Sequence, residues 1–332
     1  MCAAVKPNWT QSVEILDLRH FSSSDLRGVL EEESAVWRRE LFWDYSQSAE
    51  MILRYVDARI LPGYVAIERG RVAGYAFFVY EASKGVIGDL YVRNTLRTSN
   101  GNEYALENRL LTHAIETLKR SPGIHRIEAQ LLLHATETVS EPFLSEGFRQ
   151  HRRLFMMLPL QGAATKPESA EALAPQPFQL RRWTEHDYQQ AASLITACYR
   201  GHVDSDINDQ YRTASGSLRF LNNIVRFPGC GLFDPLSSYV AVHKDSRALA
   251  GIILCSRVKA NVGHITQICV LPEYRGAGLG AALLAANSAE LRRRNFAMLS
   301  LTVTEANHGA VDLYRRLGYQ QKKVFDAFVW EG

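Results

Sequence analysis

Short apolar runs, separated by polar and glycine-containing segments, predict strands along the first half of the chain. Four of these runs are rich in β-branched and aromatic residues, which favour strands: Tyr64–Ile67, Tyr75–Tyr80, Val86–Val92 and Ile127–Leu133. No apolar stretch approaches about 18 residues, the length needed to cross a bilayer. The pattern therefore predicts a globular chain without a membrane span.

The second half shows the same kind of pattern with clearer boundaries. Apolar and polar residues alternate over Leu299–Val303, which predicts a strand. Apolar residues then recur at helical spacing over Ala310–Leu317, and Gly318 is a helix-stop signal. A length of 332 residues exceeds what one ordinary core accommodates, so we expect two domains.

The segment Ile268–Gly280 combines a strand, a turn and the start of a helix. A β-branched run ends at Pro272, three glycines alternate at Gly276, Gly278 and Gly280, and a helical segment follows directly. The first turn of a helix offers N–H groups without intrahelical partners and the positive end of the helix dipole. Such a turn predicts an anion site, and a pyrophosphate is its natural ligand.

Three kinds of nucleotide-binding turn place glycines between a strand and a helix, as this segment does. A phosphate-binding Walker loop needs Lys and Ser or Thr after its last glycine, but Leu279–Ala281 follows here. The dinucleotide turn needs one more residue between glycines and a later acidic residue, where this chain has Arg292–Asn295. The third motif, Arg-x-x-Gly-x-Gly, is matched by Arg275, Gly278 and Gly280 and resembles the acyl-CoA motif of the GNAT N-acetyltransferases. The alternative is a turn whose glycines serve only packing.

A second motif of that family follows in the expected order. The family pattern Asn-x-x-Ala-x-x-Leu-Tyr-x-x-x-Gly-Phe/Tyr is matched in register by Asn307, Ala310, Leu313, Tyr314, Gly318 and Tyr319. Two motifs in order make the resemblance specific. It implies an α/β fold of the α+β type, with a mixed, mostly antiparallel sheet flanked by helices.

The two halves of the chain resemble each other. Gly74 parallels Gly251, and Leu90–Val92 parallels Ile268–Val270, with the order preserved and a slowly drifting offset. We interpret this as an internal duplication that gives two GNAT-like domains. The expected domains are residues 10–160 and 178–332, and the small-residue, proline-rich stretch 161–177 is the expected linker.

The first half departs from the motifs where chemistry would occur. After Arg97 it keeps one glycine, and Glu103 near the helix start would repel a pyrophosphate. The segment His134–Leu144 contains neither the Asn nor the Tyr of the second motif. The first domain is therefore expected to be degenerate, kept as a scaffold or to shape the acceptor site, and the second is expected to bind acetyl-CoA and catalyse.

The resemblance also implies roles for particular residues. Ile268 and Val270 would bind the pantetheine arm through their main chain, and Asn307 would contact it. The expected cofactor-binding residues of the turn are Arg275, Gly276, Ala277, Gly278, Leu279, Gly280 and Ala281. Tyr314 would protonate the departing thiolate, with a purely packing role as its alternative.

The general base is left open by the sequence. His264 occupies a position where some family members carry a glutamate base, and an ordinary histidine pKa of about 6.5 suits that role. Glu305 and a chain of water molecules are the other candidates. A hydrogen-bonded structural histidine is the competing interpretation of His264.

Composition excludes several other classes of function. The net charge of +3 gives no case for nucleic acid. Five cysteines, none in a C-x-x-C pair, support neither a zinc site nor a disulfide framework, and a reducing cytoplasm is the simplest compartment. Asp204, Asp206 and Asn208 imitate the start of a calcium loop, but Asp209 and Ser215 break it, so no metal is expected. The acceptor pocket is expected in the region after the first helix of the second domain, residues 198–211. The aspartates of this region would attract an amine or simply cap helices.

Three functions are compatible with these observations. The first is acetyl transfer from acetyl-CoA to the primary amine of a small molecule. The second is acetylation of protein N-termini or lysines. The third is a non-catalytic acyl-CoA sensor, which the presence of Tyr314 disfavours. No nucleic-acid or membrane partner is expected, and the sequence specifies neither the acceptor, the preferred acyl chain nor the oligomeric state.

Overall fold

The computed structural model describes residues 13–93, 104–161, 173–226 and 231–332. Most of the predicted linker and the segment after Arg97, through Glu103, lie outside these residues. The chain divides into two compact units. Unit 1 holds the described residues up to Val36, Ala49–Arg149 and Phe328–Gly332, and unit 2 holds Trp37–Ser48 and Gln150–Ala327.

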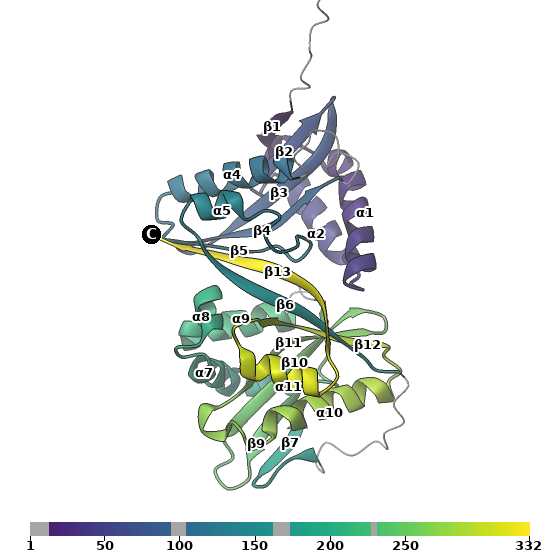
Figure 1. The fold of residues 1–332 in the computed structure, drawn as a ribbon, viewed down its shortest axis with the longest axis vertical. Coiled ribbons are helices and arrows are strands. Elements are labelled where there is room, and N and C mark those ends of the chain that lie inside the picture. Colours follow the sequence, from purple (N-terminus) through teal and green to yellow (C-terminus); the bar gives the residue numbers. More distant parts are fainter. Residues whose placement is uncertain (1–12, 94–103, 162–172, 227–230) are drawn as a thin grey trace, which may run out of the picture. The chain divides into compact units, whose positions relative to one another are not determined.

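Unit 1 consists of a β-sheet and helices that pack on it (Figure 1). Its strands, in spatial order, are β1 (Glu14–Asp17), β2 (Gly63–Glu68), β3 (Arg71–Glu81), β4 (Lys84–Val92) and β5 (Arg126–Gln130). Neighbours are antiparallel except β4 and β5, which are parallel. The helices are η1 (Leu18–His20), α1 (Ser23–Glu40), α2 (Ser46–Asp57), α4 (Ala105–Arg120) and α5 (Glu141–Ser145), with the end of α1 from Trp37 and the start of α2 to Ser48 assigned to unit 2. The four strands predicted in this half are confirmed.

Unit 2 repeats the same plan. The strands, in spatial order, are β13 (Gln320–Glu331), β6 (Arg149–Pro159), β12 (Met298–Thr304), β11 (Val262–Val270), β10 (Leu249–Lys259), β9 (Tyr239–His243) and β7 (Phe178–Arg182), and β8 (Leu232–Phe233) pairs with β10. The helices are η2 (Glu185–Asp187), α7 (Tyr188–Cys198), α8 (Val203–Ile207), η3 (Asp209–Arg212), α9 (Ala214–Arg226), η4 (Pro272–Tyr274), α10 (Leu279–Arg293) and α11 (His308–Arg316). The predicted strand over 299–303 and the predicted helix that begins near Ala310 are thus present.

Strand register supports the duplication inferred from the sequence. Gly74 pairs with Val92 in unit 1, and Gly251 pairs with Val270 in unit 2, so the glycines aligned by sequence hold equivalent places. In each unit the glycine lies against the facing strand, because a Cβ would come within 3.0 Å of a carbonyl oxygen there. Packing therefore explains why both positions are glycine.

Each unit also has a β-bulge at the same position of the corresponding strand, β4 in unit 1 and β11 in unit 2. The β3–β4 ladder skips Gly88, and the β10–β11 ladder skips Thr266. The parallel pairing with the next strand ends just before each bulge, at Ile87 with Ala129 and at Ile265 with Leu301. Because a bulge re-aims a strand, the two neighbours separate beyond this point in each unit.

The last strands of the two halves are exchanged between the units. β6 follows α5 of unit 1, yet it pairs antiparallel with β12 over Met298–Thr304 in unit 2. β13 belongs to unit 2 as far as Ala327, and its end belongs to unit 1. The predicted domains follow the order of the chain, whereas the compact units do not.

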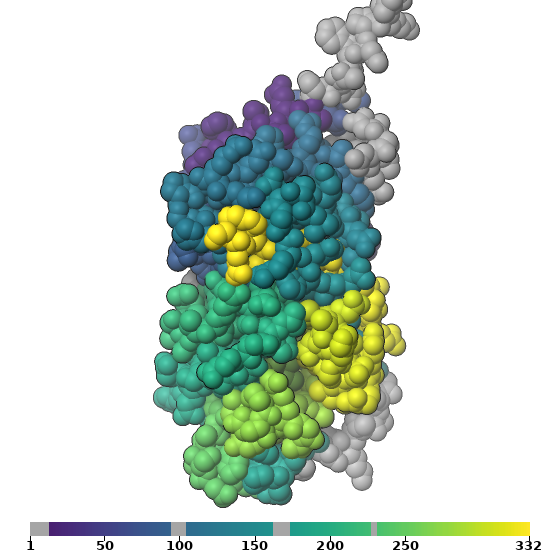
Figure 2. All heavy atoms as spheres, turned by 60° about the vertical axis from the view of Figure 1, so that its left-hand side comes forward, coloured from purple at the N-terminus to yellow at the C-terminus, as the bar shows by residue number. Residues whose placement is uncertain are grey.

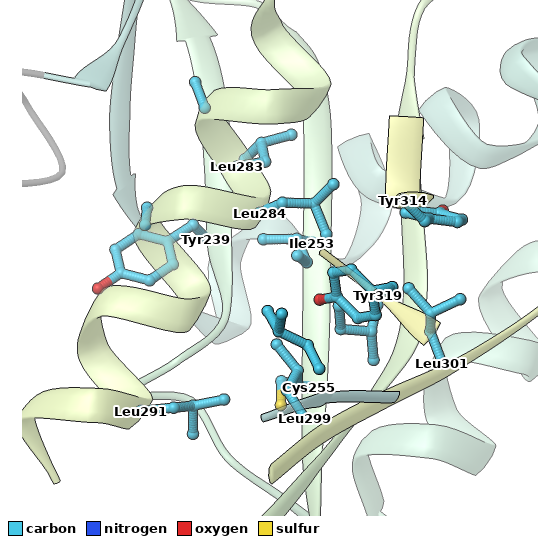
Figure 3. Close-up of a cluster of buried hydrophobic side chains, with 14 of the residues drawn as sticks. Tyr239, Ile253, Cys255, Leu283, Leu284, Leu291, Leu299, Leu301, Tyr314 and Tyr319 are labelled. Atoms are coloured by element: carbon cyan, nitrogen blue, oxygen red, sulfur yellow. The ribbon is translucent and has the colours of Figure 1, made fainter. Parts of the chain in front are cut away.

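Helices cover both faces of the unit 2 sheet with separate apolar clusters. On one face, Leu283 and Leu291 of α10 pack with Cys255 of β10 and Tyr314 of α11 (Figure 3). On the other, α7 and α9 pack through residues such as Ile195 and Leu221 against β9–β11. These two clusters hold β11 between helices and so fix the place where it separates from β12.

Candidate active site

A cavity of about 710 Å³ opens in unit 2 where β11 leaves β12. Its walls come from the end of β11, the glycine turn, the starts of α10 and α11, and the end of α7, and Figure 2 shows α11, in yellow, beside the lime-green turn. All of the predicted site residues line it except Ala277 and His264: Ile268, Val270, Arg275, Gly276, Gly278, Leu279, Gly280, Ala281, Asn307 and Tyr314. The size is typical of a small-molecule site.

The glycine turn is shaped by conformation rather than by packing. Gly276 and Gly278 have φ of +82° and +81°, the left-handed region that side chains disfavour. An added Cβ at either position would meet no heavy atom within 4 Å. Open space therefore surrounds both glycines, as a backbone that approaches a ligand requires. Ala277 lies between them and is exposed.

The start of α10 makes this turn an anion site. Gly278 is the N-cap residue, without a side chain to satisfy the first N–H groups, and α10 then runs for 15 residues. The free N–H groups and the helix dipole both favour negative charge. The start of α10 therefore offers the free N–H groups and the open space that a pyrophosphate would need.

Beyond the bulge, β11 presents an open backbone edge. Leu271 N–H donates to the carbonyl of Ala250 at 2.9 Å. Backbone groups alternate in direction along a strand, so Cys269 and Leu271 both point their N–H and C=O groups toward β10. Ile268 and Val270 consequently point theirs the other way, where the ladder to β12 has ended at Ile265. A ligand with amide groups at this edge could hydrogen-bond to the backbone of β11 as a neighbouring strand would.

Protein side chains already bind these two open carbonyls. The Tyr199 hydroxyl shares its one proton between Gln267 Oε1 at 3.1 Å and Ile268 O at 3.4 Å. Arg275 Nε donates to Val270 O at 3.2 Å. A carbonyl oxygen has two lone pairs, so each can still accept a bond from a ligand.

Asn307 and Tyr314 come to the cavity from α11. Asn307 is the N-cap residue, and its Oδ1 accepts a bond from Ala310 N–H at 3.4 Å. The Tyr314 ring packs 5.7 Å from the Tyr319 ring, but no described residue hydrogen-bonds the Tyr314 hydroxyl. Burial, with a smaller contribution from the Asp204 carboxylate, raises the pKa of Tyr314, so its hydroxyl keeps its proton.

His264 lies away from the cavity, in the interior of unit 2. Its ring packs 4.9 Å from Trp43 and 6.1 Å from Phe155, and its Nδ1 is 2.9 Å from Ser300 Oγ. Burial lowers its pKa to about 4, so the ring is neutral at pH 7. These are the surroundings of a structural histidine, the competing interpretation. Glu305 is exposed, 4.0 Å from Arg152, and does not line the cavity either.

Tyr199 and His202 also line the cavity, and both lie in the region 198–211 where the sequence predicts the acceptor pocket. His202 caps α8, because its Nδ1 accepts a bond from Asp204 N–H at 3.1 Å. The sequence indicated this region but no role for either residue. Cys269, Tyr274 and Arg316 line the cavity as well, and no motif position pointed to them.

The neighbouring Asp204 carboxylate is held in place by two side chains. It accepts a hydrogen bond from Thr304 Oγ1 and lies 3.9 Å from Arg153 Nη1. Asp206 is exposed, 3.6 Å from Arg212. Asp204 is therefore part of a local polar network beside the cavity.

Comparisons with known proteins agree with this geometry. The family model described as Acetyltransferase (GNAT) family matches residues 188–319. A mycothiol acetyltransferase from Thermobispora bispora is 47% identical over 63 residues, which cover 19% of this chain and 21% of that protein. A putative ribosomal protein bS18-alanine N-acetyltransferase from Bacillus subtilis is 34% identical over 90 residues, covering 27% of this chain and 58% of that protein. The matches thus span less than two thirds of either relative.

Solved structures share the fold along nearly the whole chain. A GCN5-related N-acetyltransferase from Sphaerobacter thermophilus superposes with a TM-score of 0.66 at 20% identity, covering 96% of this chain and 95% of that one. A tandem GNAT protein from the clavulanic acid biosynthesis pathway superposes with a TM-score of 0.58 at 15% identity, covering 96% and 98%. In the part of the chain that the structure describes, no helix is long and apolar enough to traverse a bilayer. The match over 188–319, on a fold of the tandem GNAT type, establishes that this chain carries a GNAT-family acetyltransferase domain.

Proposed function

We propose that unit 2 transfers the acetyl group of acetyl-CoA to the primary amine of a small molecule by direct attack. The observation that carries this proposal is the single cavity in which an anion-binding turn, an open strand edge and the Tyr314 hydroxyl meet. Each of these matches one chemical part of acetyl-CoA: the pyrophosphate, the amide-containing pantetheine arm and the thioester.

Acetyl-CoA would be bound mainly by backbone groups. The N–H groups at Gly278–Ala281 receive the pyrophosphate. The pantetheine amides pair with the open groups of Ile268 and Val270 and with the Asn307 side chain. Backbone binding requires little from side chains, which fits an apolar cavity whose polar groups are few.

The reaction then needs one proton removed and one delivered. The amine nitrogen attacks the thioester carbonyl carbon, the carbon–sulfur bond breaks, and the thiolate takes the Tyr314 hydroxyl proton. The tyrosinate regains a proton from water. The proton lost by the amine leaves through water, because neither His264 nor Glu305 lines the cavity.

Residues 10–160, which supply most of unit 1, are proposed to be a non-catalytic GNAT-like domain, joined through 161–177 to a catalytic domain over 178–332. In unit 1, Leu90 corresponds to Ile268 at the open edge of the strand. There, the carbonyl of Leu90 is bonded at 3.0 Å by Nε2 of His134, a buried residue. The buried His134 ring, rather than the bond itself, lies where a pantetheine arm would run, which supports one acetyl-CoA site per chain.

The search for the acceptor should include both small amines and peptides. A panel of both, assayed with acetyl-CoA and a thiol reagent, tests the proposal, and we expect thiol release with at least one small amine. Release with peptides alone would favour protein acetylation. Binding of CoA without release in any arm would favour a sensor.

The three described cysteines, Cys198, Cys255 and Cys269, are free, which supports our placing the protein in a reducing cytoplasm.

A further inference from the structure

The cavity has a direction that follows from the chemistry of acyl-CoA. The phosphates and the acyl group lie at opposite ends of that molecule. If the phosphates occupy the turn at Gly276–Ala281, the acyl group must lie at the far end of the cavity. The strand edge runs from Val270, beside the turn, back to Ile268. Tyr199 and His202 lie at the Ile268 end, because the Tyr199 hydroxyl bonds Ile268 O and the His202 ring contacts the Tyr199 ring.

Tyr199 is fixed at this end by contacts on every part of its side chain. Its hydroxyl is bonded to Gln267 Oε1 and to Ile268 O. Its ring stacks on Tyr211, with centroids 4.4 Å apart and planes 22° apart, and the His202 ring meets it edge-on at 5.3 Å. A ring held at its tip and on its face cannot swing aside without losing these contacts.

The space behind the Tyr199 ring is apolar. Tyr199, Tyr211 and Phe220 pack against the cluster between the sheet and helices α7 and α9, which includes Leu221 and Cys269. If the ring were absent, the cavity would extend toward these side chains. An alkyl chain, rather than a polar group, is the ligand part that such an extension would accept.

We propose that Tyr199 limits the length of the acyl group that unit 2 accepts, so that acetyl fits and longer chains are excluded. This inference rests on the proposed function, because it takes acyl-CoA as the ligand. It concerns binding alone, and it can be tested without knowledge of the acceptor.

The test measures the binding of CoA, acetyl-CoA, butyryl-CoA and hexanoyl-CoA to the full-length protein by calorimetry. Wild type should bind acetyl-CoA at least about tenfold more tightly than hexanoyl-CoA. Tyr199→Phe keeps the ring and should keep this ratio. Tyr199→Ala should reverse it, because each buried methylene strengthens binding about fourfold. Tyr199→Leu, a milder change with a smaller effect in the same direction, replaces Tyr199→Ala if the latter unfolds.

The possible results separate this inference from the proposed function. Equal affinity of wild type for all chain lengths would overturn the inference, and so would an unchanged ratio in both Tyr199→Ala and Tyr199→Leu with CoA binding intact. In either case the proposed function would stand. If wild type binds neither CoA nor any acyl-CoA, the proposed function fails and this inference fails with it.

Discussion

Arg275 Nη2 lies 2.9 Å from the carbonyl oxygen of Cys198, so the arginine of the glycine turn also holds the end of α7. Arg275→Ala should weaken CoA binding about tenfold to a hundredfold, since hydrogen bonds from a charged group contribute about 1.5–3 kcal/mol. Arg275→Lys should be intermediate, because an ammonium keeps the charge but cannot reach two carbonyls as a planar fork does. Calorimetric titration with CoA measures both. Arg219→Ala, an exposed arginine on α9, is the control. Unaltered affinity in Arg275→Ala would show that the turn binds through backbone alone.

Gly278→Glu should abolish CoA binding, because it puts bulk and negative charge at the start of α10. Gly123 offers a matched control, since its φ is +79° against +81° at Gly278 and its surroundings are also open. Gly123→Glu adds the same strain and charge in unit 1 and should leave binding unchanged. Titration of wild type should give one CoA per chain. Two equivalent sites would contradict the proposal that unit 1 is closed by His134.

Tyr314→Phe should lower kcat by about 10²–10⁴-fold with little change in CoA affinity, as the loss of a general acid does. Tyr319→Phe is the control, because the neighbouring Tyr319 hydroxyl is buried and has no hydrogen-bond partner among the described residues, so its loss should be neutral. The acid acts only while protonated. Because the pKa of Tyr314 is raised, turnover should not decline up to about pH 10, the ordinary tyrosine value. Full turnover in Tyr314→Phe would leave the hydroxyl with a packing role only.

His264 should make unit 2 less stable in acid. Its folded-state pKa of about 4 lies below the ordinary value of about 6.5, so the unfolded chain takes up the proton first. Stability is therefore complete above about pH 6.5 and falls as the pH drops toward 4, by up to about 1.4 kcal/mol per unit. His264→Phe, which suits the aromatic neighbours, should remove this slope in denaturant unfolding at pH 7 and 5. The exposed His186→Gln should retain it. The same slope in both variants would assign the acid sensitivity to other groups.

Leu154→Ala should destabilise unit 2, although Leu154 follows the last helix of the first half. Leu154 is fully buried in the cluster beneath α10 and α11, and such truncations cost about 2–5 kcal/mol. Calorimetry with and without CoA identifies the unit 2 transition, because a ligand stabilises the part that binds it. Leu111→Ala, equally buried in unit 1, should lower a transition that CoA does not shift. If Leu154→Ala instead lowered that CoA-insensitive transition, β6 would contribute to unit 1.

Local patterns in the sequence predicted most elements and most of the cavity walls. Strands such as Tyr75–Tyr80 and the turn at Gly278 depend on neighbouring residues, and local propensity therefore indicates them. The exchange of β6 depends on pairing between residues far apart in the chain, for which the apolar pattern is the same in either unit. The burial of His264 was likewise hidden, because its partner Trp43 comes from a distant segment.

The exchanged end of β13 affects how unit 1 forms as the chain leaves the ribosome. Phe328 is buried in unit 1, where its ring stacks on Phe143 with centroids 4.1 Å apart. Phe143 is synthesised 185 residues earlier than Phe328. Until Phe328 emerges, one side of the Phe143 ring has no native partner, and an apolar surface of this kind invites premature association. A nascent chain stalled before Phe328 should therefore engage chaperones that release the finished protein.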